Sequence, residues 1–392
     1  MRFNLWEDCN RVPLTELLSF IVDNRGKTVP TAPSGHKLIA TNCVTNNTLF
    51  PVYDKIRYLS EETYQTWFRA HPIPGDILFV NKGTPGRVCL VPDPVDFCIA
   101  QDMIALRADE SKIYPKYLFT VLRSREIQQQ IYNTNVGDVI PHFKKQFLDQ
   151  LLIPIPERSI QESIGDLYYV LSLKAERNKK INDNLADLLQ TIYQGRFGND
   201  ILAVNQGVLS DICSYSTDKV AVSELNVRTY FSTENMLSGK AGSTEATSLP
   251  TTSQTTACHK GDTLISNIRP YFKKIVYCED KCGCSTDVLC FTPSQSCYSA
   301  YLFSTLYADK FFAFMVAGSK GTKMPRGDKQ QIMTYPVVLP SEEELAGFNT
   351  IASPLLEQIY SNRAENKRLS ILRDTLLPKL MSGEIDVSAI QL

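Results

Sequence analysis

Apolar and polar residues alternate along this chain in two different ways. Short β-rich apolar runs at residues 77–80 and 263–265 stand between prolines, glycines and asparagines, as strands joined by turns do. A helix is expected at residues 115–132, and an apolar run flanked by proline follows at residues 151–156. These segments predict compact domains of mixed α+β structure.

Two long segments instead carry apolar residues alternately four and three positions apart. The second segment lies 188 residues after the first. A stripe with this heptad spacing predicts a long helix that packs along one face against another helix. The positions predicted to pair are Ile160, Ile164, Leu167, Leu171, Asn178, Ile181, Leu185, Leu188 and Ile192 in the first segment, and Phe348, Leu355, Ile359, Asn366, Leu369, Leu376 and Leu380 in the second.

Polar residues interrupt both stripes near the middle. Lys174 and Asn178 do so in the first stripe, and Asn362 and Asn366 in the second. An antiparallel pairing of the two helices would bring these positions together, and a polar residue in a helical seam fixes register. The alternative is that each stripe belongs to an ordinary core helix of its own domain.

The second half of the chain repeats the motifs of the first in the same order. Gly75-Asp76 and Asn81 return 186 positions later as Gly261-Asp262 and Asn267, and Tyr117-Leu118-Phe119 returns 184 positions later as Tyr301-Leu302-Phe303. We therefore predict an α+β fold of two tandem units, each a globular mixed α/β domain followed by a long helix, with the helices paired as an antiparallel coiled coil of pseudo-twofold symmetry. The expected domains are globular domain 1 (1–156), long helix 1 and linker (157–204), globular domain 2 (205–340), and long helix 2 with the C-terminal tail (341–392).

Composition narrows the class of protein. The chain has 392 residues, 43% of them hydrophobic, so it can form packed cores, and 41 basic residues against 42 acidic ones exclude a polybasic nucleic-acid coat. The globular segments hold 30 basic and 27 acidic residues, and the helical segments 11 and 15. Eleven cysteines without regular spacing, no leader-like start and no membrane-spanning run predict a cytoplasmic protein.

Basic residues are concentrated in loops of the globular domains. Residues 269–274 and 320–327 combine basic residues with aromatic residues or glycine, and residues 82–87 and 144–145 take the corresponding places in the first domain. Such loops suit phosphate contacts and the reading of base edges, although they could also be ordinary solvated loops. The predicted DNA contacts are Asn81, Lys82, Thr84, Arg87, Lys144, Lys145, Asn267, Arg269, Tyr271, Lys273, Lys274, Lys320, Lys323 and Arg326.

No catalytic motif is convincing. Residues 25–28 resemble the end of a phosphate-binding loop, but the glycine that this loop needs at position 21 is replaced by isoleucine. A metal-dependent nuclease site could use Asp93, Glu110 and Lys112, or the set Asp262, Glu279 and Lys281. The cysteines at residues 278–297 have a spacing that is irregular for zinc ligands, so we predict packed thiols and no metal site. Metal binding by this cluster remains an alternative.

Four motifs within the duplicated plan carry a family resemblance. They are Asn24-Arg25-Gly26-Lys27-Thr28, Ser266-Asn267-Ile268-Arg269-Pro270-Tyr271-Phe272-Lys273-Lys274, Gly321-Thr322-Lys323-Met324-Pro325-Arg326 and Leu376-Leu377-Pro378-Lys379-Leu380-Met381-Ser382-Gly383-Glu384-Ile385. With them the chain resembles the specificity subunit of type I restriction–modification systems over nearly its whole length.

The resemblance implies a non-catalytic subunit that reads DNA. Each globular domain would be a target recognition domain for one half of a bipartite double-stranded site, and the helices would set the spacing and dock two methylase subunits. Restriction subunits would join the complex. S-adenosylmethionine, ATP and magnesium would belong to those partners, with no cofactor in this chain. Two alternatives remain at this point: a stand-alone metal-dependent DNA endonuclease, and a coiled-coil adaptor without DNA binding.

Overall fold

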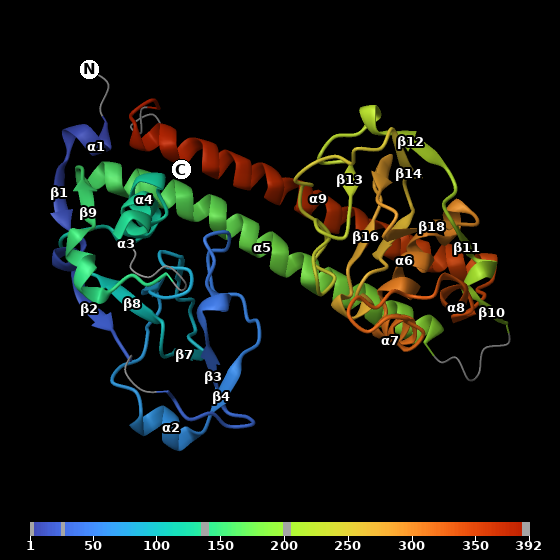
Figure 1. Ribbon diagram of the computed structural model, residues 1–392, viewed down its shortest axis with the longest axis horizontal. Helices are drawn as coiled ribbons and strands as arrows, with labels where there is room; N and C mark the ends of the chain where they lie inside the picture. Colours follow the sequence, from blue (N-terminus) through green and yellow to red (C-terminus); the bar gives the residue numbers. More distant parts are fainter. Residues whose placement is uncertain (1–3, 25–27, 135–140, 199–204, 386–392) are drawn as a thin grey trace. The chain divides into compact units, whose positions relative to one another are not determined.

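The protein divides into two compact units (Figure 1). The computed structural model describes residues 4–24, 28–134, 141–198 and 205–385, so part of the motif at 24–28 lies outside the described residues. Unit 1 comprises Met1–Lys179 and Ala364–Leu392, and unit 2 comprises Lys180–Arg363. Two helices of 40 residues, α5 (Arg158–Phe197) and α9 (Glu342–Met381), contribute to both units. The domain limits drawn from the sequence stay predictions.

Unit 1 contains three small sheets. A four-stranded antiparallel sheet has the order β2-β8-β5-β6, a three-stranded sheet the order β4-β3-β7, and a third sheet pairs β1 with β9. The strands are β1 (Asn10–Pro13), β2 (Leu18–Val22), β3 (His36–Ile39), β4 (Arg57–Leu59), β5 (Ile77–Val80), β6 (Val88–Leu90), β7 (Phe97–Ile99), β8 (Met103–Ala108) and β9 (Leu152–Ile155). Every residue of β5 is buried, which explains its unbroken apolar run.

Helices cover the four-stranded sheet of unit 1. They are α1 (Leu5–Asp8), α3 (Pro115–Leu122), α4 (Arg125–Thr134) and the first part of α5, whereas α2 (Glu61–Thr66) packs with the three-stranded sheet. The single helix predicted at residues 115–132 is therefore two helices. The break lies where the buried Arg123 donates to the carbonyl oxygen of Val88 (2.8 Å) and the Ser124 hydroxyl accepts the Ile127 N–H (3.3 Å), starting α4.

Unit 2 repeats this plan. Its main sheet has the order β11-β18-β15-β16, a second sheet the order β12-β14-β17-β13, and β10 pairs with β19. The strands are β10 (Gln206–Val208), β11 (Cys213–Tyr215), β12 (Lys219–Ala221), β13 (Tyr230–Phe231), β14 (Gln254–Cys258), β15 (Thr263–Ser266), β16 (Ile275–Tyr277), β17 (Cys282–Cys284), β18 (Val288–Pro293) and β19 (Pro336–Val338). The helices are α6 (Ser299–Tyr307), α7 (Asp309–Ala317), α8 (Lys329–Met333) and α9, with the short 3-10 helix η6 (Pro270–Phe272) before β16.

Equivalent residues make equivalent bonds in the two units. The fully buried Tyr117 donates its hydroxyl to the carbonyl oxygen of Pro154 at 2.9 Å in unit 1. Tyr301, 184 residues later, is also fully buried and donates to the carbonyl oxygen of Val338 at 2.5 Å in unit 2. Each tyrosine thereby joins the helix after the main sheet to the strand that precedes a long helix. The predicted duplication of a mixed α/β unit is confirmed.

The two long helices pair antiparallel inside each unit. In unit 1, Asn178 of α5 donates its Nδ2 to Asn366 Oδ1 at 2.9 Å. In unit 2, Asn362 of α9 donates its Nδ2 to Asn182 Oδ1, also at 2.9 Å. Rising numbers in α5 thus meet falling numbers in α9. The predicted antiparallel pairing, with polar residues facing each other, is confirmed.

The buried stripe of α5 departs from the predicted heptad in its second half. The side chains of Ile181 and Leu188 are 45% and 47% exposed, and Asn182, Leu189 and Tyr193 occupy the buried face instead. A straight helix of 3.6 residues per turn drifts by about 20° per heptad relative to a 3.5-residue repeat, so the stripe moves by about one position over roughly ten turns, close to the length of α5. The other predicted pairing positions are buried or half-buried. None of the described helices is long and apolar enough to cross a bilayer.

Candidate nucleic-acid interface

In unit 1 a buried asparagine holds together the loops at the end of β5. The backbone N–H of Asn81 donates to the Asp102 carbonyl oxygen (2.8 Å), and the Asn81 carbonyl oxygen accepts the Phe143 N–H (2.8 Å). The Asn81 side chain is fully buried and donates its Nδ2 to the Phe143 carbonyl oxygen at 3.2 Å. Its Oδ1 accepts no hydrogen bond from the described residues. Three loops therefore converge on one residue.

The same frame recurs in unit 2. The Asn267 N–H donates to the Asp287 carbonyl oxygen (2.8 Å), and the Asn267 carbonyl oxygen accepts the Gly327 N–H (3.3 Å). Asn267 is 7% exposed, and its Oδ1 likewise receives no bond from the part of the chain that the structure describes. Both asparagines were predicted to contact DNA. The structure places them beneath the loops, where they position the backbone.

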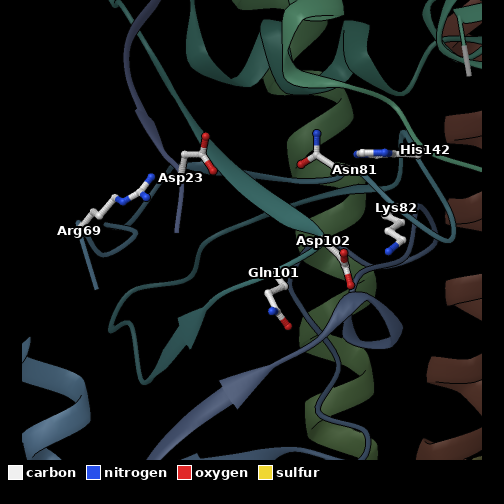
Figure 2. A pocket seen from close by; sticks show the side chains of 7 residues that line it. All are labelled: Asp23, Arg69, Asn81, Lys82, Gln101, Asp102 and His142. Atoms are coloured by element: carbon white, nitrogen blue, oxygen red, sulfur yellow. The ribbon is translucent and has the colours of Figure 1, made fainter. Parts of the chain in front are cut away.

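The frame in unit 1 borders an open cavity of about 580 Å³. Figure 2 shows Asn81, Lys82 and His142 on one side and Asp23 and Arg69 opposite, with Gln101 and Asp102 between them. The lining side chains come from the ends of β2, β5 and β7, the loop at residues 141–143 and the segment after α2, so the cavity lies between loops of two sheets.

The cavity combines hydrogen-bond donors and acceptors. Arg69 and Lys82 offer the donors that recognise guanine or phosphate, Gln101 offers the paired donor and acceptor that suit adenine, and carboxylates can accept from the cytosine amino group. The carboxylate of Asp23 is bound to Lys145 Nζ at 3.1 Å. Five of the lining residues were not predicted as site residues: Asp23, Arg69, Gln101, Asp102 and His142. The repetition of Asp102 as Asp287 was an available signal, whereas nothing in the sequence singled out Arg69.

The remaining predicted contacts of unit 1 lie on the rim of its loops. The turn between β5 and β6 uses two glycines with positive φ, Gly83 (84°) and Gly86 (87°), and leaves Thr84 and Arg87 half-buried. Lys82, Lys144 and Lys145 are exposed. This loop is therefore a compact turn whose accessible groups are polar or basic.

In unit 2 the predicted basic residues fall into two groups. Lys273 Nζ binds Asp309 at 2.9 Å, and Lys274 Nζ donates to the Thr233 carbonyl oxygen at 2.5 Å, where burial lowers the pKa of Lys274. Both ammonium groups are thus held against the protein, and Arg269 is half-buried. The exposed set is Tyr271, Lys320, Lys323 and Arg326.

Two of the exposed basic residues form ion pairs at the loop bases. Arg326 contacts Asp287 at 3.0 Å and Lys320 contacts Asp328 at 2.5 Å. The Lys320 side chain is nevertheless 80% exposed, so its ion pair with Asp328 is open to solvent. A phosphate could readily replace the Asp328 carboxylate as the partner of Lys320. These residues surround the loop that carries Tyr271.

The nuclease candidates do not assemble as a metal site. Asp93 and Glu110 line one cavity of about 350 Å³, but Lys112 Nζ binds the Glu16 carbonyl oxygen (2.9 Å) and Asp109 (3.3 Å). Across residues 4–24, 28–134, 141–198 and 205–385, no group of three or more His, Cys, Asp or Glu side chains is arranged to hold a metal ion.

Five cysteines of unit 2 form a buried cluster with side chains of both four-stranded sheets. Cys258, Cys278, Cys282, Cys284 and Cys290 are all buried, and the sulfur atoms of Cys278 and Cys282 are 3.5 Å apart. They share a hydrophobic cluster with Met236, Leu264 and Val276. The packing of these thiols accounts for their irregular spacing in the sequence.

Comparisons with known proteins point to one class, DNA specificity proteins of restriction–modification systems. Residues 19–187 match the family described as "Type I restriction modification DNA specificity domain". The chain is 34% identical over 73 residues to the type I restriction enzyme MjaIX specificity subunit of Methanocaldococcus jannaschii, covering 19% of this chain and 17% of that one. It is 24% identical over 153 residues to the HindI specificity subunit of Haemophilus influenzae, covering 38% and 33%. These matches span a third or less of the relatives' lengths.

The fold comparison covers nearly the whole chain. The type I restriction–modification S subunit from M. genitalium superimposes with a TM-score of 0.59 at 18% identity, over 97% of this chain and 98% of that one. Residues 19–187 therefore match the family of type I DNA specificity domains, and nearly the whole chain has the fold of the S subunit from M. genitalium. The resemblance drawn from the sequence is confirmed.

Proposed function

We propose that this protein is the non-catalytic DNA-specificity subunit of a type I restriction–modification enzyme. Each unit reads one half of a bipartite duplex site through the loops around Asn81 or Asn267. Methylase subunits, two per chain, dock on the long helices, and restriction subunits complete the assembly. S-adenosylmethionine, ATP and magnesium bind to those partner subunits. The complex works in the cytoplasm.

One observation carries this proposal: identical backbone frames display unlike side chains. The N–H groups of Asn81 and Asn267 make the same 2.8 Å bond to Asp102 and Asp287, but the loops above them differ in sequence and shape. A duplicated scaffold with two different sets of accessible polar groups is suited to two different half-sites. A bipartite site also matches two units that share a pair of helices.

Mapping of methylated bases, followed by binding measurements, tests the proposal. The full chain with its methylase subunits should modify one bipartite sequence. Replacing residues 1–156 by those of another family member should change only one half of that sequence. Modification of a single contiguous site, or an unchanged site after the replacement, contradicts the proposal.

Single variants test the loops. Lys82→Ala and Lys323→Ala should each weaken duplex binding and reduce the slope of log K against log salt by about 1, because each removes one phosphate contact. Asp102→Asn should change the preferred base at one position with little change in that slope. Lys219→Ala, an exposed lysine on β12 outside these loops, is the matched control and should behave as the parent protein.

The helices would act as a ruler between the half-sites. Because α5 and α9 pair antiparallel, an insertion must be made in both helices at one level, between Asn178 and Asn182 and between Asn362 and Asn366. Seven residues in each helix add about 10 Å, close to three base pairs at roughly 3.4 Å each. The methylated site should gain about three base pairs of spacer with both half-sites unchanged. An unaltered spacer rejects the ruler.

A further inference from the structure

Two adjacent aromatic rings project from the η6 loop of unit 2. Tyr271 and Phe272 are 50% and 38% exposed, with their ring centroids 4.7 Å apart. Met324, on the neighbouring segment, is 50% exposed. Large apolar side chains that gather at an exposed loop mark a contact surface when polar residues surround them. The role of these rings is distinct from the hydrogen-bond readout proposed above.

The backbone holds these rings in a strained conformation. Arg269 and Lys273, on either side of η6, have φ values of 50° and 51°, in the left-handed region that non-glycine residues rarely occupy. Such strain persists only where the surroundings enforce it, and it is concentrated at functional sites. Here the Arg269 N–H donates to the Pro325 carbonyl oxygen at 2.7 Å.

Further bonds tie the far side of the loop. The Gly239 N–H donates to the Phe272 carbonyl oxygen (2.8 Å), and the Lys240 N–H donates to the Lys273 carbonyl oxygen (2.9 Å). Asp309, the first residue of α7, receives both Lys240 Nζ (2.8 Å) and Lys273 Nζ (2.9 Å). The backbone of the loop is therefore anchored on both sides while its two rings remain in solvent.

The charge around the rings identifies their occupant. Lys320, Lys323 and Arg326 are exposed on the segment that the Arg269 bond joins to the loop, and an isolated β-bridge pairs Ile268 with Arg326. A ligand that meets exposed rings inside a basic border must be an anion with flat apolar faces. Duplex DNA with a partly opened base step has this chemistry.

We propose that Tyr271 and Phe272 form a rigid wedge that enters one base-pair step of the second half-site and partly unstacks it. Unit 2 thereby reads how easily that step deforms as well as its base edges. This inference rests on the proposed function of the chain. Pyrimidine–purine steps unstack most readily, so the wedge favours such a step at its position.

Fluorescence of 2-aminopurine, placed in turn at each adenine of the mapped site, tests the wedge. In the complex of the full chain with its methylase subunits, one position in the second half-site should brighten severalfold on binding, and it should differ from the methylated position, where a methylase itself flips the base out of the stack. The double variant Tyr271→Ala/Phe272→Ala should lose this signal and bind about tenfold more weakly, in line with the loss of an aromatic stacking contact. It should also lose the preference for a flexible step over a stiff one.

Controls separate the possible failures. Tyr132→Ala removes a 73% exposed aromatic side chain on α4 of unit 1 and should leave the signal intact. Tyr271→Leu/Phe272→Leu keeps apolar bulk at the loop and should restore part of the brightening, provided that thermal unfolding matches the parent protein. If the complex binds its bipartite site but no position brightens, the wedge is wrong and the specificity function stands. If no bipartite site is found, the function itself fails.

Discussion

The two units have equivalent frames, but the loops that follow their central strands β5 and β15 differ in shape and in the side chains that they expose. In unit 1 the loop after β5 turns tightly through Gly83 and Gly86 beside a cavity of about 580 Å³. In unit 2 the loop after β15 reaches positive φ at Arg269 and Lys273, without glycine, and projects two aromatic rings. One scaffold thus supports a polar hollow in one unit and an apolar protrusion in the other.

Under the proposed function, this difference gives the two half-sites two different sets of accessible groups on one duplicated scaffold. The bonds of Asn81 and Asn267 fix where each loop starts, and the buried tyrosines fix the helices behind it. The residues above that frame are free to change because they take no part in it. Variants in the frame should therefore affect both units alike, and variants in the loops should affect each unit differently.

The buried tyrosines give the largest expected effect. Tyr117→Ala and Tyr301→Ala should each destabilise their own unit by about 3–5 kcal/mol, because each opens a large cavity and leaves a carbonyl group unpaired. Tyr117→Phe and Tyr301→Phe, which remove only the hydroxyl, should cost about 1 kcal/mol each. Denaturant unfolding combined with hydrogen exchange resolves the two units. Unequal costs for the two hydroxyls would break the equivalence of the units.

Substitutions in the asparagine pairs of the long helices should cause the second-largest loss of stability. Asn178→Leu leaves Asn366 Oδ1 without its donor in a buried seam and should cost about 1–3 kcal/mol. The double variant Asn178→Leu/Asn366→Leu should recover part of that loss, because Asn366 Oδ1 is then absent while Glu365 still lacks its bond from Asn178. Urea unfolding of single and double variants measures the coupling. Asn182→Leu with Asn362→Leu is the matched pair in unit 2, and additive costs in either pair would contradict a direct bond.

Much of this fold could be predicted from local patterns. The repeat spacing located equivalent strands such as β5 and β15, and the four-three spacing located α5 and α9. The exact buried face of α5 could not be predicted, because a small mismatch between helix and heptad period accumulates until Leu189 replaces Leu188. The buried face of α5 also depends on how the helix packs against neighbouring elements, and the spacing of apolar residues in the sequence does not contain this information.

The candidate site was predicted less completely. Basic loop residues such as Lys82 and Lys323 stood out by type, but Arg69 and Gln101 reach the cavity only through the arrangement of two sheets. Asn81 and Asn267 were located by their repetition and yet are buried supports. Repetition marks residues that maintain the shared frame, and the proposed function assigns the difference in recognition to residues that differ between the units.

The two kinds of loop should differ in their response to glycine and alanine. Gly86→Ala should cost about 1–2 kcal/mol, since alanine resists a φ of 87° and its Cβ would lie 3.1 Å from side-chain atoms of Gln128 and Ile131. Arg269→Gly should stabilise unit 2 by about 0.5–1 kcal/mol, because relief of strain exceeds the added chain entropy. Arg269→Ala keeps the strain and should not stabilise. Thermal unfolding compares the three variants, and a destabilised Arg269→Gly protein would show that no strain is stored there.

The smallest expected effect is the contribution of His71 to the pH dependence of the stability of unit 1. His71 stacks on Tyr64 at 4.4 Å, His36 stacks on Tyr64 at 3.9 Å, and burial lowers the pKa of His71 below its usual 6.5. Below pH 6.5 the unfolded chain therefore binds a proton on His71 more readily than the folded chain does. The stability that the neutral imidazole supplies is complete above pH 6.5 and declines as pH falls toward the lowered pKa.

His71→Phe tests this dependence because it keeps a ring beside Tyr64 and cannot titrate. The free energy of unfolding of the parent protein should fall between pH 7.5 and 6, and that of His71→Phe should fall less over the same range. If His71→Phe and the parent protein lose stability at the same rate, the imidazole is as readily protonated in the folded unit as in the unfolded chain. The aromatic stack would then be open to water.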